Sequence, residues 1–506
     1  MAITSLKFFA FLAVIYLLYC LVPRQKRWFV LLGASLFFYV VCGSLRLFVV
    51  TLLQILVAYG AAIRTDKQQR EVVSTKINTA GILICLAVLF QIGALLYYKE
   101  MNFFVTNGNI LLHLLGKEST LSLWQIVAPL GISYYTLSYI AYILDVYWGV
   151  VSPQRNFLKF CLFGIYFPIM LSGPITRYQE IEQDLYAGNR ADYQGFCFGL
   201  QRILWGLFKK LVIADRMAPI VQEIWSGDFY GWCVLIGVLG YAWQLYMDFS
   251  GCMDIVLGAS ELFGIRLPEN FNTPLYATSL SEYWRRWHIT LGAWVKDYVM
   301  YPILKTKGLQ TRAKKWKKKY GKKMGKKMTT WIGLFFTWLV VGLWHGGAWT
   351  FVFGSGLFFF LMIVGGQILE PIGKWCIEKM HIPTQSFGWK LWQRIRTFVL
   401  FSASISFSWS ASMKDGFRMW ARCFKPTNLS SLLPLASRAD WFLLVIGAVI
   451  VWLISYGKQK EDVRMYVAKK ALPVRWILYL VLLFAVLICG VYGPGYDASS
   501  FIYGQF

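Results

Sequence analysis

Residues 80–98 read AGILICLAVLFQIGALLYY, and this stretch decides the class of fold. It contains no charged side chain, and as an α-helix it is about long enough to cross the ~30 Å hydrocarbon core of a bilayer. Similar apolar runs recur at residues 8–22, 441–456 and 476–492. We therefore predict an all-α, polytopic membrane protein.

The composition of the chain favours the same class. Of its 506 residues, 57% are hydrophobic and only 15% are charged, whereas a soluble protein of this length would carry far more surface charge. The basic residues gather in a few loops between the apolar runs, as is typical of cytoplasmic loops. Membrane topology thus explains the formal charge of +26, and we expect no nucleic-acid partner.

The basic loops also predict a topology. We place inside the loops at residues 23–28, 64–76, 152–159, 305–327, 374–396 and 457–470. Counting the spans between them gives roughly eleven crossings, with the N-terminus and the C-terminus both outside. Segments broken by Gly and Pro near 103–116 and 160–175 are candidates for re-entrant structure. We expect one integral-membrane domain over residues 1–506, with the first apolar run retained as an anchor.

The longest polar stretch, residues 305–328, reads KTKGLQTRAKKWKKKYGKKMGKKM and has twelve Lys or Arg residues and no acid. We interpret it as a basic cytoplasmic loop that lies on anionic lipid, where each nearby basic side chain contributes ~1 kcal/mol. A specific site for a polyanion is the alternative.

One histidine, His345, lies inside an apolar and aromatic run, within WHGGAW. A helix that leaves the cytoplasmic face near Trp331 would carry it ~21 Å inward, past the middle of the bilayer. Gly342, Gly346 and Gly347 permit a broken backbone there, which a membrane tolerates only where protein buries it or a cavity borders it. We expect His345 to face a buried chamber, either as a functional group or as a hydrogen-bonded structural histidine.

A second histidine, His288, lies in SLSEYWRRWHITLGAWVKDYVMYP, residues 279–302. The tryptophans, Tyr298 and the basic residues of this stretch predict an amphipathic helix at the membrane interface. In the simplest interpretation His288 is an interfacial residue held by an aromatic belt. His113 and His381 lie in polar-flanked stretches and suggest no function.

Three acids, Asp248, Asp254 and Glu261, lie in or near apolar sequence. Asp254 and Glu261 are seven residues apart and so share a helix face. We favour pairing with arginine, or capping of a broken helix, over catalysis. The chain has no H-E-x-x-H motif and no cysteine pair, so nothing predicts a metal site.

These segments carry a family resemblance. The order of DFSG (248–251), LPENFN (267–272), WRRWH (284–288) and LWHG (343–346) resembles the membrane-bound O-acyltransferase (MBOAT) family. It is most similar to the bacterial branch that contains the alginate O-acetylation membrane subunit and the teichoic-acid D-alanylation membrane protein. The likeness extends to the stretches GISYYTLSYIAYILDVYWG (131–149), FPIMLSGPITRY (167–178) and FIYGQF (501–506).

The resemblance implies a ring of helices around a tunnel in which a cytoplasmic acyl thioester meets an acceptor from outside. His345 would be the catalytic histidine and His288 the second family histidine, nearer the cytoplasm. Structural or tunnel-lining roles fall to Asp248, Asn270, Trp344 and Gly346. Relatives usually carry a Gly-Gly-Asn-Arg loop after the proline that matches Pro302, a departure that concerns the handling of the donor. They commonly have Phe at the position of Gly504, a departure that concerns partner contacts.

The implied partners and substrates follow from the same resemblance. They are membrane lipid, an extracellular polysaccharide acceptor and a secreted or anchored SGNH-type acetyltransferase or esterase, in a bacterial cell membrane. The donor would be acetyl-CoA or an acyl carrier protein thioester, used as a co-substrate and not as a bound cofactor.

The chemistry is consistent with an O-acyltransferase. Acyl transfer to a hydroxyl needs a base, and a histidine in a chamber of low dielectric stays neutral and able to accept a proton. Backbone N–H groups near Gly346 and Gly347 are candidates to stabilise the oxyanion. D-alanyl transfer to teichoic acid is one alternative. A transporter or flippase in which His345 relays protons is another, of a different class.

Overall fold

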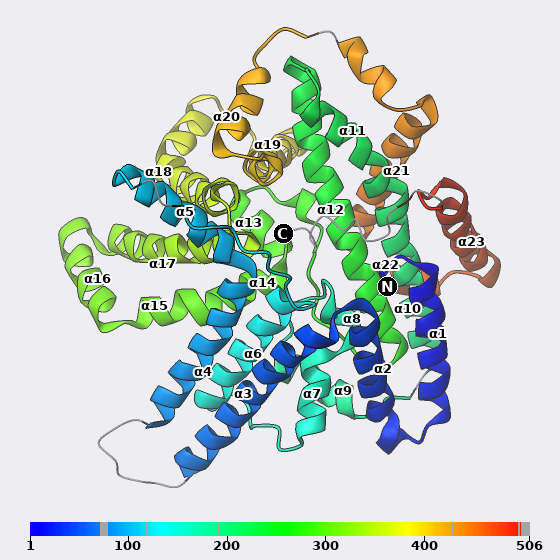
Figure 1. Cartoon of the computed structure of the whole chain (residues 1–506). Coiled ribbons are helices and arrows are strands. Elements are labelled where there is room, and N and C mark those ends of the chain that lie inside the picture. The colour runs from blue at the N-terminus through cyan, green and yellow to red at the C-terminus, as the bar shows by residue number, and fades with distance from the viewer. Residues whose placement is uncertain (71–78, 118–119, 191, 428, 494–495, 497–506) are drawn as a thin grey trace. The chain divides into compact units, whose positions relative to one another are not determined.

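The computed structural model describes residues 1–70, 79–117, 120–190, 192–427, 429–493 and 496 (Figure 1). The described residues are helical or irregular, and one isolated antiparallel bridge joins Phe271 and Trp287. The all-α class is therefore confirmed. The terminal motif FIYGQF and Gly504 lie outside the described residues.

Within the described part of the chain, six helical segments are long and apolar enough to cross a membrane. They are Leu45–Lys67, Thr79–Leu114, Lys322–His345, Thr350–Lys379, Arg438–Lys458 and Leu472–Cys489, and Leu6–Leu21 is a shorter apolar helix. The prediction of a polytopic membrane protein is confirmed, because each segment is apolar and at least long enough to cross the hydrocarbon core. The count of eleven crossings and the outside position of both termini stay predictions.

The contacts divide the chain into two units, and the single domain that we expected from the sequence stays a prediction. Unit 1 comprises residues 1–212, 248–268 and 463–506, and unit 2 comprises residues 213–247 and 269–462. Helix α12 (Gly231–Leu262) contributes its first part to unit 2 and its last part to unit 1.

Unit 1 is built from α1 (Leu6–Leu21), α2 (Arg27–Cys42), α3 (Leu45–Arg70), α4 (Thr79–Leu95), α5 (Met101–Leu114), α6 (Ile132–Tyr147), α7 (Phe157–Ile165), α8 (Phe167–Met170), α9 (Tyr178–Tyr186), α10 (Tyr193–Leu207), α22 (Val463–Ala468) and α23 (Leu472–Cys489). Buried amides join some of these helices. Gln54 of α3 donates to Gln91 of α4 at 2.9 Å and to Thr136 of α6 at 3.1 Å. Hydrogen bonds between polar side chains of this kind hold helices together in an apolar environment.

The two segments that we expected to be broken behave differently. The expectation is wrong for residues 103–116, because α4, a π-helical turn and α5 form one continuous run over Thr79–Leu114. Near 160–175 the chain does break, since α7 ends at Ile165 and α8 ends at Met170. Residues 172–176 follow without helical structure and are buried in the protein, the condition that a membrane imposes on irregular backbone.

Helices α10 and α12 pack closely through glycines. A Cβ atom at Gly206 would lie 2.5 Å from the carbonyl oxygen of Gly251, and one at Gly199 would lie 2.8 Å from that of Gly258. Small residues of this kind let two membrane helices approach backbone to backbone.

Ion pairs join α12 to α10 and to the π-helical segment η3 (Phe208–Ala214) that follows α10. Arg202 contacts Asp254 at 3.0 Å and Glu261 at 3.3 Å, so the two acids share a face and meet an arginine, as expected. Lys210 pairs with Asp248 at 2.6 Å, and these two side chains are only 2% and 1% exposed. Buried charges need such partners, because isolated charges are costly to remove from water.

Unit 2 is built from α11 (Asp215–Ser226), the first part of α12, α13 (Leu280–Arg286), α14 (Ile289–Val295), α15 (Tyr301–Lys305), α16 (Lys307–Tyr320), α17 (Lys322–His345), α18 (Phe358–Lys379), α19 (Phe387–Ile405), α20 (Met413–Arg422) and α21 (Arg438–Lys458). Two π-helical segments, η5 (Lys296–Met300) and η6 (Thr350–Leu357), lead into α15 and α18. This unit contains both candidate histidines.

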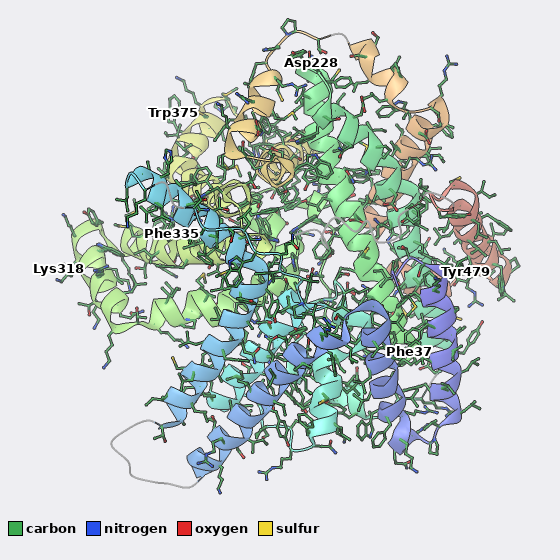
Figure 2. All side chains as sticks on the ribbon, viewed as in Figure 1. Phe37, Asp228, Lys318, Phe335, Trp375 and Tyr479 are labelled. Atoms are coloured by element: carbon green, nitrogen blue, oxygen red, sulfur yellow. The ribbon has the colours of Figure 1, made fainter. Side chains whose placement is uncertain are left out.

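The basic stretch at residues 305–328 is helical and not the loop that we expected. Helices α16 and α17 lie side by side (Figure 1), and a Cβ atom at Gly325 of α17 would lie 2.5 Å from the backbone nitrogen of Lys317. Only Leu309 and Ala313 of α16 are buried, so its basic side chains, such as Lys318 in Figure 2, face outward. Lysine, leucine and alanine favour helix, which the charge pattern alone did not indicate.

Candidate active site

Helix α17 carries His345 as its last residue. The helix begins at Lys322, nine residues before the start that we assumed, and its 24 residues span about 36 Å. Its basic end and its histidine are therefore joined by one continuous helix. His345 is buried, with 6% of its surface exposed, as expected for a histidine in a chamber.

The backbone breaks directly after His345, as the glycines predict. Gly346 is extended, with φ 175°, so the glycine is not needed for a left-handed turn. It is needed for space, because a Cβ atom there would lie 2.7 Å from the ring of Phe351. Likewise a Cβ atom at Gly342 would lie 2.9 Å from the carbonyl oxygen of Phe351, so both glycines let α17 and η6 pack closely.

The single amphipathic helix predicted around His288 is wrong, and its position at the membrane interface stays a prediction. The stretch forms two short helices, α13 and α14, with a break at Trp287 and His288. Trp287, Trp294 and Tyr298 are at most 8% exposed, and Trp287 stacks on Tyr283 and also packs against the ring of Phe271. These aromatic side chains pack inside the protein instead of forming a belt at the membrane interface.

Local sequence explains the break. Ser279 caps α13 by accepting a hydrogen bond from the Glu282 N–H at 3.2 Å. After α13 the chain extends, and Trp287 pairs with Phe271 in the isolated bridge. His288 follows with φ 45°, a left-handed conformation that is uncommon outside glycine and often marks a functional site.

Asn270 holds His288 in place. Its Oδ1 atom lies 3.2 Å from Nδ1 of His288, and the same oxygen accepts from the Thr290 N–H at 3.2 Å and the Thr290 hydroxyl at 3.0 Å. The Asn270 carbonyl also accepts from the Ile289 N–H at 3.1 Å. Asn270 and His288 are each 1% exposed, so these bonds form in a dry environment.

The structure brings the two candidate histidines together. Their ring centroids are 6.3 Å apart, and the Trp344 ring lies 5.7 Å from His288 and 5.1 Å from His345. His288 lies outside the candidate spans, and burial, with a further contribution from His345, lowers the pKa of His288 well below its ordinary value. His288 is thus neutral near pH 7, and a neutral imidazole can accept a proton or a hydrogen bond.

A cavity of about 590 Å³ reaches His288. Leu334, Trp338 and Val341 line it from α17, and with His345 they follow the spacing of one helix face. Trp284 and the basic side chains of Arg285 and Lys296 line it as well. The cavity is therefore mostly apolar, with charge among its walls, and its size suits a small organic ligand.

The other predicted residues fall into two groups. Asn270, Trp344 and Gly346 lie in unit 2, at or beside the two histidines. Asp248 belongs to unit 1, where it pairs with Lys210. The sequence analysis missed Thr290 and Trp284 as contributors to the site. Thr290 was missed because nothing in the sequence indicates that the Phe271–Trp287 bridge brings Asn270 to it.

Comparison with known proteins identifies the family. Residues 83–314 match the model of the membrane-bound O-acyltransferase family, MBOAT. The chain belongs to the MBOAT family. The matched segment of this MBOAT protein contains His288 and Asn270, while His345 lies beyond its end.

The similarity of this MBOAT protein to individual bacterial proteins is consistent with the family. A probable alginate O-acetylase AlgI from Azotobacter vinelandii is 34% identical over 356 residues, which are 68% of this chain and 64% of the relative. The peptidoglycan O-acetyltransferase of Helicobacter pylori is 29% identical over 69% of this chain and 67% of the relative. The teichoic acid D-alanyltransferase of Bacillus subtilis is 28% identical over 44% of this chain and 55% of the relative. The alginate match spans less than two thirds of that relative's length.

Proposed function

We propose that this MBOAT protein is a membrane O-acyltransferase. In this proposal it moves an acyl group, acetyl in the first instance, from a cytoplasmic thioester to hydroxyls of an extracellular polysaccharide or to a partner that acts on it. Two observations support the proposal best: the ring centroids of the two buried histidines are 6.3 Å apart, and a cavity of about 590 Å³ reaches one of them, His288.

In the proposed reaction His345 is the general base. It takes the proton of the acceptor hydroxyl while the oxygen attacks the thioester carbonyl carbon. A C–O bond forms, the C–S bond breaks, and the departing thiolate receives the proton from His345. N–H groups near Gly346 and Gly347 would stabilise the negative charge on the carbonyl oxygen. Holding donor and acceptor at one point supplies the advantage of proximity.

The proposed donor is acetyl-CoA or an acyl carrier protein thioester, and its arm would occupy the cavity that reaches His288. Apolar walls suit the aliphatic parts of such an arm. The Trp284 indole N–H is buried and has no hydrogen-bond acceptor among the described residues, so it offers a donor to an amide carbonyl of the arm.

The relatives support a polysaccharide acceptor, because their names refer to alginate and peptidoglycan acetylation. We propose in addition a secreted or anchored SGNH-type partner and a location in the bacterial plasma membrane with both termini outside. The relative named a teichoic acid D-alanyltransferase supports D-alanyl transfer as a second candidate function, although it matches less of this chain.

The test uses the purified full chain in detergent with acetyl-CoA or an acetylated carrier protein, labelled in the acetyl group. We expect the label to move to a polysaccharide acceptor or to water, and His345→Ala to slow this by ~10²- to 10⁴-fold. His113→Ala, which changes an exposed histidine of α5, is the matched control. Absence of transfer and hydrolysis with both donors, together with movement of a lipid-linked sugar across vesicles, would favour a flippase instead.

A further inference from the structure

The hydrogen bonds around Asn270 fix the orientation of its amide. The Thr290 backbone N–H can only donate, so the atom of Asn270 that faces it, 3.2 Å away, must be the carbonyl oxygen. The Thr290 hydroxyl and Nδ1 of His288 meet the same oxygen. Rotating the amide by half a turn would place an NH₂ group against the Thr290 N–H, which rules the flipped form out.

This orientation also fixes the tautomer of His288. Because Oδ1 of Asn270 can only accept, Nδ1 of His288 must carry the hydrogen of their 3.2 Å bond. In a neutral imidazole the other nitrogen, Nε2, then has the lone pair. His288 is thus held with an acceptor atom on the edge of the ring opposite Asn270.

The NH₂ group of Asn270 has no such partner. Its Nδ2 atom is buried and makes no hydrogen bond within the part of the chain that the structure describes. Asn270 is 1% exposed, so solvent does not satisfy this donor freely. A buried amide donor without an acceptor is costly, and beside a candidate reaction site a ligand atom can supply the missing acceptor.

We propose that Asn270 is a positioning residue that holds His288 as the Nδ1–H tautomer and offers its Nδ2–H group to an oxygen of the bound substrate. The substrate oxygen is the thioester carbonyl or the acceptor hydroxyl, which share this hydrogen-bonding chemistry. The assignment of the substrate rests on the proposed acyltransferase function, whereas the assignment of the tautomer does not.

The tautomer is tested by ¹⁵N NMR of the full chain labelled at histidine, in detergent or nanodiscs. The chain has four histidines, so the signals are few, and loss of one pair in His288→Asn assigns His288. We expect the proton on Nδ1 in the wild type and a shift toward the Nε2–H form in Asn270→Ala. Asn272→Ala is the matched control, because Asn272 is exposed and lies two residues away. A proton on Nε2 in the wild type, or no change in Asn270→Ala, would overturn the proposal.

Asn270→Asp separates the two parts of the proposal. It keeps the acceptor for Nδ1–H, removes the Nδ2 donor and adds a negative charge that favours protonated His288. We expect the Nδ1–H tautomer to persist and His288 to become protonated at higher pH than in the wild type. The other ionisable groups around His288 are His345 and the cavity residues Arg285, Lys296 and Asp297, which this variant leaves in place. An unchanged titration would count against contact between the two side chains.

Turnover tests the Nδ2 contact. Each lost positioning hydrogen bond slows transfer by about fivefold, so we expect about fivefold for Asn270→Asp at a pH where His288 is neutral and about 25-fold for Asn270→Ala. Wild-type turnover in Asn270→Asp would overturn the substrate contact. A chain that transfers no acyl group at all would contradict the proposed function, while the NMR result for the tautomer would still stand or fall by itself.

Discussion

The two histidines differ in what surrounds them. His345 closes α17, and the backbone breaks after it, whereas His288 is fixed by Asn270 in a left-handed conformation between two short helices. A general base must accept a proton and then release it, whereas a positioning group must keep a fixed orientation. The firm attachment of His288 therefore supports a positioning role in the proposed reaction, in which His345 is the proposed base.

Replacement of each histidine by asparagine distinguishes these roles. Asparagine tolerates the left-handed conformation of residue 288 and can form hydrogen bonds, but it cannot act as a base near neutral pH. We expect His288→Asn to slow acyl transfer by about fivefold, the effect of one positioning hydrogen bond, and His345→Asn to slow it by ~10²- to 10⁴-fold.

The measurement is transfer of a labelled acyl group at matched expression. Equal and nearly complete losses in both variants would show that the two histidines act as one catalytic unit, and the division of labour would be wrong.

At this scale the sequence predicted some features and missed others. The burial of His345 and the break after it follow from one ionisable residue in a long apolar run with adjacent glycines. The partnership of Asn270 with His288 does not follow, because it depends on a bridge between residues 271 and 287. The local sequence does not predict that residues 271 and 287 pair.

At the scale of single elements, the stretch at 305–328 shows the limit of charge patterns. Twelve basic residues without an acid predict a position next to anionic lipid, and they say little about backbone conformation. The intrinsic preference of lysine for helix and the close contact at Gly325 decide the conformation instead. The prediction for the aromatic stretch around His288 was wrong for another reason: its aromatic side chains pack against other residues of unit 2, which the sequence pattern does not indicate.

We expect that replacing the basic residues between 314 and 327 by glutamine weakens binding to anionic lipid or delivery of the donor. Each basic side chain near an anionic surface contributes ~1 kcal/mol, and glutamine keeps the helical preference. Topology should not change, because the remaining basic loops still mark the inside.

Cysteine labelling from each side of the membrane measures the topology, and transfer activity in nanodiscs with and without anionic lipid measures the lipid effect. An inverted chain would show that this stretch alone orients the protein. Equal activity in both kinds of nanodisc, for wild type and variant alike, would exclude a role for lipid charge.

At the scale of the whole molecule, stability depends on charges that are buried in the protein. Lys210 and Asp248 of unit 1 are 2% and 1% exposed. Lys210→Met should therefore lower the free energy of unfolding by about 3–5 kcal/mol, because it leaves the Asp248 carboxylate buried without its partner. The double variant Lys210→Met, Asp248→Leu should recover most of this loss, because it removes both charges.

Thermal unfolding in detergent reads these differences, and Lys318→Met, which changes an exposed lysine, is the control. If the double variant is no more stable than Lys210→Met, the ion pair is not the source of the effect.

The number of membrane crossings is also a property of the whole molecule. Charge counting suggested roughly eleven, while length and hydropathy pick out six long spans among the described residues. The apolar helix α1 has 16 residues and is too short to be counted among the six.

Helix α17 is unbroken from Lys322 to His345, so the number of residues between these ends determines where His345 lies around and along the helix axis. Each residue turns an α-helix by about 100° and advances it by about 1.5 Å. Inserting one alanine in the middle of α17 would swing His345 about a quarter of the way around the helix axis, away from His288. Inserting seven would return it to nearly the same bearing but move it by about 10 Å along the axis. The histidine thus has an angular and an axial coordinate, and no single insertion or deletion preserves both.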